Sequence, residues 1–265
     1  MANQFHEIFE AIPPGSLLLV HASFRQCKAE GLTPEEVIGL LLSRLGPQGT
    51  LAMPTFSYNY IRHPSSTAYD PAVTPGVENG ILSEIFRKTP GVLRSSNPTY
   101  SVAVCGKYAE LLTSGSKDNA GLGHGSSYEN AMKLGAKILL LHVGNNRNSM
   151  LHYAEIVSGV PYNDIPFRES WGRTALTVHG EMELLPEFPA CSEEFSKFDG
   201  PFVREGFAQK IGDSFLIDSA AMVKYICRAI GKQPDIMLCR DPLCEPCIRR
   251  RQRLLERGLI RSANL

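Results

Sequence analysis

The sequence predicts an α/β fold in which helices flank a central sheet whose first two strands pair in parallel. Three observations support this prediction. Residues 16–22 are a short apolar run after two prolines and a glycine, which is typical of a buried strand. Residues 33–45 are typical of a helix, because Thr33 can cap it, Pro34 suits its first position and apolar residues recur on one face. Residues 50–54 are a second short apolar strand, so the order is strand, helix, strand.

The later elements continue this alternation. We predict helices over residues 80–88, 108–113, 128–134, 149–157 and 219–230, strands over residues 100–105 and 137–143, and a hairpin from residues 174–179 and 181–185. The irregular stretch at residues 57–77 is rich in aromatic side chains. This argues for a functional loop rather than a disordered one.

Charge and composition exclude several classes of protein. The 265 residues contain 27 basic and 27 acidic side chains, so the formal net charge is zero, and we expect no nucleic-acid partner. No apolar run is long enough to span a bilayer, the start lacks a signal-peptide pattern and the seven cysteines form no framework. We therefore expect a cytoplasmic protein with no membrane partner. One domain over residues 1–265 is expected, with a cysteine-bearing tail at about 234–265, and a homo-oligomer is left open.

The segment at residues 146–155 carries the clearest chemistry. It directly follows the strongest predicted strand, and ligands of open α/β sheets bind beyond the carboxyl ends of strands. His152 and Glu155 are three residues apart on a predicted helix and so share a face. A neutral imidazole can accept a proton from an amine, and a carboxylate can orient the ring or hold a cation. A histidine satisfied by packing, beside a surface glutamate, is the alternative.

Other strand ends and loops offer ligand contacts. His21 and Ser23 follow the first strand, and Thr55 and Phe56 follow the second, so both pairs are candidates to line one crevice. Arg94, Ser95 and the glycine-rich loop at 123–127 are candidates for phosphate binding, since guanidinium forks and helix-opening loops suit that anion. Ordinary turn chemistry is the alternative in each case.

The cysteines near the end of the chain leave two interpretations. Cys239, Cys244 and Cys247 are spaced so that a zinc ion is one interpretation, with a fourth ligand such as Cys191. Because the spacing departs from paired C-x-x-C sets, we predict reduced thiols instead and name no metal ligand. The arginines at 249–251 are typical of a solvated helix face.

Six short motifs also occur in a characteristic order. They are Val20-His21-Ala22-Ser23-Phe24; residues 46–51 with Met53-Pro54-Thr55-Phe56; Tyr69-Asp70-Pro71 with Thr74-Pro75; Arg94-Ser95-Ser96-Asn97-Pro98; residues 123–126; and Leu151-His152-Tyr153-Ala154-Glu155. As an ordered set they resemble the aminoglycoside 3-N-acetyltransferases, of the antibiotic N-acetyltransferase superfamily that is distinct from the GNAT fold. The resemblance runs over residues 17–162 and more weakly to about 230. The chain departs from it at Leu32-Thr33, at Asn97 and in the tail.

The resemblance implies a mostly parallel central sheet flanked by helices, with an acceptor-side subregion of loops and a β-hairpin. It implies an acyltransferase that uses acetyl-CoA as co-substrate and a small-molecule amine, an aminoglycoside or related amino sugar, as acceptor, in the context of antibiotic resistance. His152 looks like the general base. The coenzyme contacts that it implies are His21, Ser23, Thr55, Phe56, Arg94, Ser95 and Ser126.

We accordingly predict direct acetyl transfer in a ternary complex. His152 removes a proton as the acceptor nitrogen attacks the thioester, and groups near Ser23 or Thr55 stabilise the oxyanion. The cationic acceptor is expected near Glu155, and the predicted substrate-binding residues are Tyr58, Asp70, Asn146 and Glu169.

Several alternatives stay open at this point. One is an amino-sugar acyltransferase of surface-polysaccharide or natural-product biosynthesis. Another is a non-enzymatic interaction protein stabilised by a metal in the cysteine tail, and a third is a degenerate acetyltransferase that only binds coenzyme. A covalent route would require a nucleophilic cysteine in the cleft.

Overall fold

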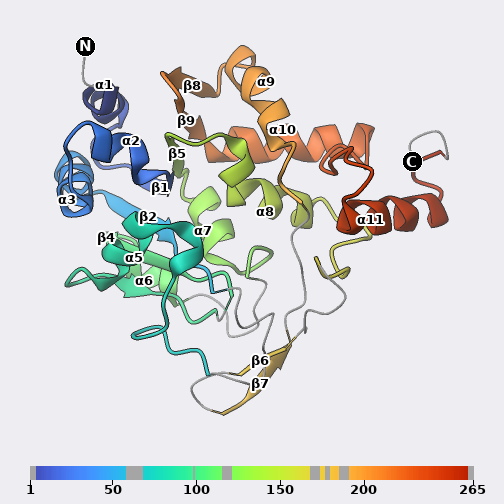
Figure 1. Cartoon of the computed structure of the whole chain (residues 1–265), viewed down its shortest axis with the longest axis horizontal. Coiled ribbons are helices and arrows are strands. Elements are labelled where there is room, and N and C mark those ends of the chain that lie inside the picture. Colours follow the sequence, from blue (N-terminus) through green and yellow to red (C-terminus); the bar gives the residue numbers. More distant parts are fainter. Residues whose placement is uncertain are drawn as a thin grey trace.

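The computed structural model describes residues 4–57, 68–97, 99–114, 121–167, 174–176, 180–184 and 191–261. A seven-stranded sheet lies at its centre (Figure 1). In spatial order the strands are β3 (Leu93–Arg94), β4 (Val102–Gly106), β2 (Thr50–Pro54), β1 (Leu17–Ala22), β5 (Lys137–Leu141), β9 (Ser214–Asp218) and β8 (Ala208–Ile211). The central strand β1 pairs in parallel with β2 and β5, which confirms the predicted strand–helix–strand unit.

The prediction of a mostly parallel sheet is wrong. Only the pairs β2–β1 and β1–β5 are parallel. Strand β4 is antiparallel to both of its neighbours, β2 and β3, and strand β9 is antiparallel to both of its neighbours, β5 and β8. For two of these four antiparallel pairs, β3–β4 and β8–β9, the physical reason is the length of the connection. Residues 212–213 alone join β8 to β9, and residues 95–101 join β3 to β4. A connection this short reverses the chain, because parallel neighbours need a crossover of a dozen or more residues.

Helices cover both faces of the sheet and make three layers. On one face lie α1 (Gln4–Ala11), α2 (Phe24–Ala29), α3 (Pro34–Leu45) and α5 (Ile81–Lys88). On the other lie α6 (Ala109–Thr113), α7 (Ser127–Lys133), α8 (Ser149–Val157) and α10 (Ser219–Lys232). Alternate residues of β1 divide between the two cores: Leu18 and Val20 pack on the first side, Leu17 and Leu19 on the second. The predicted helices and strands between residues 17 and 157 are confirmed within a few residues at each end.

Local signals explain where two of these helices begin. At α3, the Thr33 hydroxyl accepts a hydrogen bond from the Glu36 amide at 3.2 Å, and the Glu36 carboxylate accepts one from the Thr33 amide at 2.7 Å. This reciprocal cap confirms the predicted start of the helix. At α8, the side chain of Asn148 accepts from the Met150 amide at 3.2 Å. Because α8 is buried nearly all round, its position relative to the sheet is tightly fixed.

A two-stranded ribbon lies apart from the main sheet (Figure 1). It consists of β6 (Thr174–Leu176) and β7 (Met182–Leu184), which pair antiparallel and confirm the predicted hairpin. The Tyr69 amide donates a hydrogen bond to the Leu176 carbonyl at 2.9 Å, so the ribbon is attached to the segment that precedes α5. Within the described ranges, no helix combines the length and the apolar character needed to cross a bilayer.

The C-terminal part contains η3 (Phe195–Phe198), α9 (Asp199–Arg204) and α11 (Glu245–Glu256). The prediction that the arginines of α11 form a solvated face is wrong for two of them. Arg250 is fully buried and Arg251 is 7% exposed. Each donates to backbone carbonyls: Arg250 Nη2 to Ile165 at 2.8 Å, and Arg251 Nη2 to Leu238 at 3.2 Å. These acceptors replace water around the guanidinium groups.

Candidate active site

A cavity of about 760 Å³ lies at the carboxyl ends of the three parallel strands. This is the edge at which open α/β sheets bind ligands. His21 and Ser23 contribute from the end of β1, and Phe56 from the segment after β2. The turn η2 (Asn145–Arg147) and the start of α8 contribute from the segment after β5. The first turn of α5 and η1 (Val77–Asn79) supply a further wall.

His152 lies in the first turns of α8 and lines this cavity, with 8% of its surface exposed. Its Nδ1 atom is 3.1 Å from Oε2 of Glu155. An ionised carboxylate only accepts hydrogen bonds, so beside one the Nδ1 atom is the donor, and in the neutral ring the lone pair then lies on Nε2. One face of the imidazole packs against Phe195, with ring centroids 5.0 Å apart. The ring is therefore oriented by a hydrogen bond and by packing, and it borders a cavity.

Glu155 lies behind the ring and is fully buried. Its Oε1 accepts a hydrogen bond from the Tyr162 hydroxyl at 2.8 Å. Burial, and then the neighbouring charge of Glu155, raise the pKa of Tyr162 well above its usual value, so this hydroxyl stays protonated and donates. Burial lowers the pKa of Arg250, while the charge of Glu155 acts in the opposite direction, so the two side chains are electrostatically coupled. Glu155 is thus held in place by the Tyr162 hydroxyl and interacts electrostatically with Arg250.

His21 is a second buried histidine of the cavity wall. It is 5% exposed, and desolvation lowers its pKa to about 3, so the imidazole is neutral at physiological pH. Its Nε2 atom has no hydrogen-bond partner in the described structure. Ser23, two residues on, precedes α2 without capping it through its side chain. Both residues therefore have polar atoms that the fold itself does not use.

Comparisons with known proteins agree on one family. A sequence profile of the aminoglycoside 3-N-acetyltransferases matches residues 19–230. Aminoglycoside N(3)-acetyltransferase IV of Salmonella sp is 31% identical over 88% of this chain and 91% of its own length. The chain belongs to this family.

Solved structures of such enzymes share the fold. The apoenzyme of aminoglycoside acetyltransferase AAC(3)-IVa superposes with a TM-score of 0.80 at 28% identity, covering 94% of this chain and 95% of that one. A histidine-to-alanine mutant of AAC(3)-IVa in complex with gentamicin gives a TM-score of 0.79, also at 28% identity, with 95% and 96% coverage. As an aminoglycoside 3-N-acetyltransferase family member, the chain is an acyltransferase, and acetyl-CoA is the co-substrate of the family's reaction. The family disfavours the alternative of a non-enzymatic interaction protein.

In this acetyltransferase, two of the expected coenzyme contacts serve the fold instead. Thr55 is fully buried, and its hydroxyl lies 3.0 Å from that of Ser101. The Arg94 guanidinium donates to the Thr55 hydroxyl at 3.0 Å, to the Thr55 carbonyl at 2.6 Å and to the Thr74 carbonyl. It also lies over the Tyr69 ring. Neither residue lines the cavity, so the expected roles of Arg94 in phosphate binding and Thr55 in oxyanion stabilisation are not supported.

Three further expected contacts also lie outside the cavity lining. The Ser95 hydroxyl accepts from the Val102 amide at 2.9 Å, and Ser126 caps α7 by accepting from the Glu129 amide at 3.2 Å. Asp70, an expected acceptor contact, accepts from the Ala72 amide at 2.8 Å and so shapes a turn. In each case a nearby backbone amide uses the side-chain oxygen.

Glu155 is a different case. It is fully buried, lies outside the cavity lining and hydrogen-bonds to His152, so its position favours orienting the ring, and its contact with the cationic acceptor stays a prediction. By contrast, the cavity does contain Phe56 and Asn146, two of the predicted contacts. Tyr58 and Glu169, predicted to bind substrate, lie outside the described residues.

Three ionisable residues of the cavity lining, His142, Arg147 and Glu78, were not among the predicted contacts. His142 directly follows β5 with a φ of 54°, and its Nδ1 lies 2.7 Å from Oδ1 of Asp213. A non-glycine residue in the left-handed region often marks a functional position. Arg147 and Glu78 are exposed, and neither has a charged partner among the described residues. Their position after β5 and before α5 was the signal available in the sequence, since the ends of strands and helices surround the ligand in this architecture.

Proposed function

We propose that this protein transfers the acetyl group of acetyl-CoA to an amino group of an aminoglycoside or related amino sugar, with His152 as the general base. The observation that carries this proposal is the arrangement of His152: Nδ1 bound to Glu155, and the ring on a cavity wall. The acceptor class rests on family membership and on the gentamicin complex of AAC(3)-IVa. A carboxylate that fixes the tautomer of a basic histidine is a recurrent device of acyl-transfer enzymes.

In the proposed reaction, the acceptor ammonium first gives up a proton to water and becomes a neutral amine. Its nitrogen attacks the thioester carbonyl, and His152 Nε2 takes the second proton as the carbon–nitrogen bond forms. The carbon–sulfur bond then breaks, releasing an amide and the CoA thiolate. The imidazolium is stabilised by Glu155 through Nδ1–H. Ser23 remains as the predicted contact able to donate a hydrogen bond to the oxyanion, now that Thr55 lies outside the cavity.

The charged residues of the cavity fit the two substrates. The exposed carboxylate of Glu78 is placed to attract a polycationic acceptor, since opposite charges raise the local concentration of a ligand. The exposed guanidinium of Arg147 is suited to a phosphate of the coenzyme, which it can bind with two parallel hydrogen bonds. All seven cysteines are described and none lines the cavity, which favours direct transfer over an acetyl-cysteine intermediate.

An acceptor panel tests the function. Purified protein is mixed with acetyl-CoA and either aminoglycosides or nucleotide-linked amino sugars, and free thiol is measured with time. We expect thiol release with aminoglycosides and a loss of about 10²–10⁴-fold in kcat for His152→Ala, the usual contribution of a general base. His6→Ala, an exposed histidine of α1, is the matched control and should retain full activity.

The outcomes separate the proposal from its alternatives. Thiol release only with nucleotide-linked amino sugars would favour the biosynthetic acyltransferase. An unchanged kcat in His152→Ala would remove the general-base role, as would a loss confined to the affinity for acetyl-CoA. A burst of free CoA without any acceptor would indicate the covalent route.

A further inference from the structure

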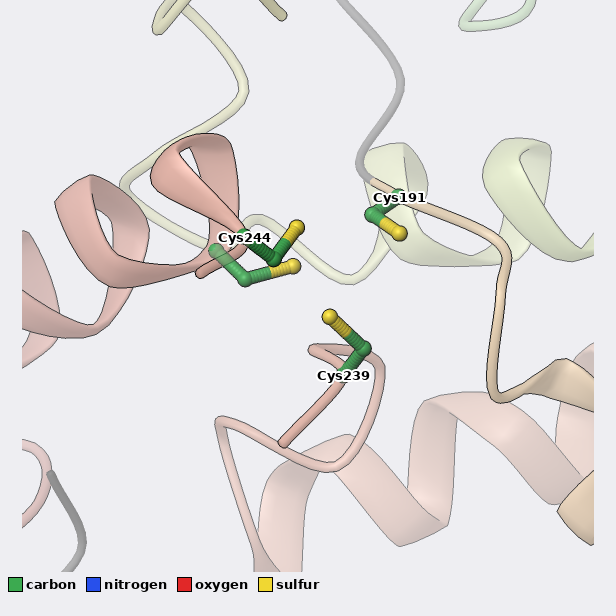
Figure 2. Close-up of side chains that lie close together, drawn as sticks. Cys191, Cys239 and Cys244 are labelled. Carbon is green, nitrogen blue, oxygen red and sulfur yellow. The ribbon is translucent and has the colours of Figure 1, made fainter. Parts of the chain in front are cut away.

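Four cysteine side chains converge beside η3 and the start of α11, outside the cavity lining. The sulfur atoms of Cys191, Cys239, Cys244 and Cys247 all lie within 4.8 Å of one another. They come from three segments: the residues before η3, the loop between α10 and α11, and the start of α11. Figure 2 shows the side chains of Cys191, Cys239 and Cys244 grouped around one space between these segments. The remaining cysteines, Cys27, Cys105 and Cys227, are not part of this cluster.

We propose that this cluster binds one structural Zn²⁺ ion through four thiolates. Zinc in such sites is tetrahedral with Zn–S distances of about 2.3 Å, which places the sulfur atoms about 3.8 Å apart. The sulfur atoms therefore need to contract by only about 1 Å. Four soft thiolates and no nitrogen or oxygen ligand favour zinc over magnesium or calcium. Because all four positions are filled by protein, the site is closed and has a structural role.

Groups around the cluster suit bound thiolates. The Glu193 amide donates to the Cys191 sulfur at 3.5 Å. Amide donors of this kind orient the sulfur atoms and neutralise part of their charge. They stabilise the charged form that a metal requires.

Two buried arginines, Arg250 and Arg251, lie where they can balance the negative charge of the proposed zinc site. One Zn²⁺ with four thiolates carries a net charge of −2. Arg250 is fully buried and interacts electrostatically with Cys247, and Arg251 donates to the backbone carbonyl of Cys239 at 2.5 Å. Burying two arginines is costly unless anions lie nearby. Carboxylates supply part of this charge, since Arg250 is coupled to Glu155 and Arg251 Nε lies 3.8 Å from Asp235 Oδ2. A zinc tetrathiolate would add further negative charge beside both arginines, whereas four neutral thiols would not.

The proposed zinc ion would connect α11 to the catalytic helix. Cys191 precedes Phe195, whose ring packs on His152, and Cys247 lies on the same helix as Arg250, which is coupled to Glu155. Loss of the metal should therefore loosen both supports of the His152 ring. This inference does not depend on the identity of the acceptor.

Metal analysis of the full-length protein tests the site. Protein purified without chelator or immobilised-metal resin should contain about one zinc per chain by inductively coupled plasma mass spectrometry. Cys239→Ser and Cys244→Ser should lose it, and Cys105→Ser, outside the cluster, should keep it. A strong chelator should lower the thermal midpoint of wild type by more than about 5 °C. Cobalt substitution should give the absorption of a tetrahedral tetrathiolate site.

A second measurement on wild type remains decisive if the serine variants fail to fold. Titration of the native thiols with p-mercuribenzoate, followed with a zinc indicator, should release one zinc as the four cluster thiols react. The proposal is overturned by zinc below about 0.1 per chain in protein from zinc-replete medium, since a closed site retains its metal. Stoichiometric iron in its place, or disulfides joining these cysteines, would overturn it equally.

Discussion

His152 and Arg94 both belong to motifs of the acetyltransferase family and both are largely enclosed, yet the fold uses them differently. His152 has one nitrogen bonded to Glu155, and its ring borders the cavity. Arg94 directs its donors to Thr55, Thr74 and Ser101, and it lies outside the cavity lining. The two residues differ in whether the fold itself uses their hydrogen-bonding atoms. A motif identifies the family, but only the partners of each polar atom show whether a residue serves the ligand or the chain.

The largest effect that tests this comparison is expected for Arg94→Lys. A lysine keeps the charge but cannot replace the fork that bonds several acceptors at once. We expect the free energy of unfolding to fall by about 3 kcal/mol, because carbonyls bonded to a charged donor lose it. The KM for acetyl-CoA should stay unchanged. Urea unfolding and steady-state kinetics measure the two quantities, with Arg228→Lys on the exposed face of α10 as the control. A higher KM for acetyl-CoA with unaltered stability would instead indicate that Arg94 binds the coenzyme.

His21, the second buried histidine of the cavity wall, is expected to make the stability of the protein depend on pH. Its pKa is about 3 in the folded protein and 6.5 in the unfolded chain, so between these values the unfolded state binds the extra proton. Stability from the neutral, buried ring is complete above pH 6.5 and falls as the pH decreases, by about 2 kcal/mol between pH 6.5 and 5. His21→Gln should lose this slope in urea unfolding at each pH.

Protonation of acidic groups does not account for the loss of stability between pH 6.5 and 5. Burial opposes ionisation of Glu84, but hydrogen bonds from Arg87, Lys88 and Gly76 hold its pKa at about 2, so its stabilisation is lost only below about pH 4.5. The exposed His6, substituted by Gln, should leave the slope unchanged. A wild-type slope that persists in His21→Gln would mean that His21 is not the buried neutral group.

Two serines that precede helices are expected to differ by the smallest effect. Ser126 and Ser23 both precede a helix, but only the Ser126 hydroxyl accepts a capping bond, from Glu129. Ser126→Ala should lose about 1 kcal/mol of unfolding free energy with normal kinetics. Ser23→Ala, on the cavity wall, should change kinetics with little loss of stability. Calorimetry and acetyl-CoA kinetics on both variants provide the check, and a raised KM in Ser126→Ala would contradict the structural role.

Local signals explain how much of the fold could be predicted. The caps at Thr33 and Asn148 and the apolar runs of β1, β2 and β5 lie within a few residues of the elements they determine. The strand β8 was missed because its two central residues, Gln209 and Lys210, are exposed on an edge, so it lacks an apolar run. Its partner β9 was missed as well, and with them the antiparallel side of the sheet.

The candidate site, like the fold, could be predicted only in part from the sequence. His21, Ser23, Phe56, Asn146 and His152 reach the cavity because strand ends meet at one edge, a rule that needs only residue order. Arg94 donates a hydrogen bond to Thr55, so each residue determines the role of the other. The spacing of the two residues along the chain does not reveal this contact. Cys191 was named from the sequence as a candidate fourth ligand, but the irregular spacing of the cysteines favoured reduced thiols, and only the fold shows that the four sulfur atoms converge.

The coupling of Arg250 to Glu155 also sets an order of events during synthesis. The ribosome releases the segment with His152 and Glu155 well before α11, which carries the cation. A nascent chain that has already formed β1, β2 and β5 still lacks this counter-charge, and its buried carboxylate is incompletely compensated. The electrostatic support of Glu155 is therefore completed late in translation, when α11 emerges.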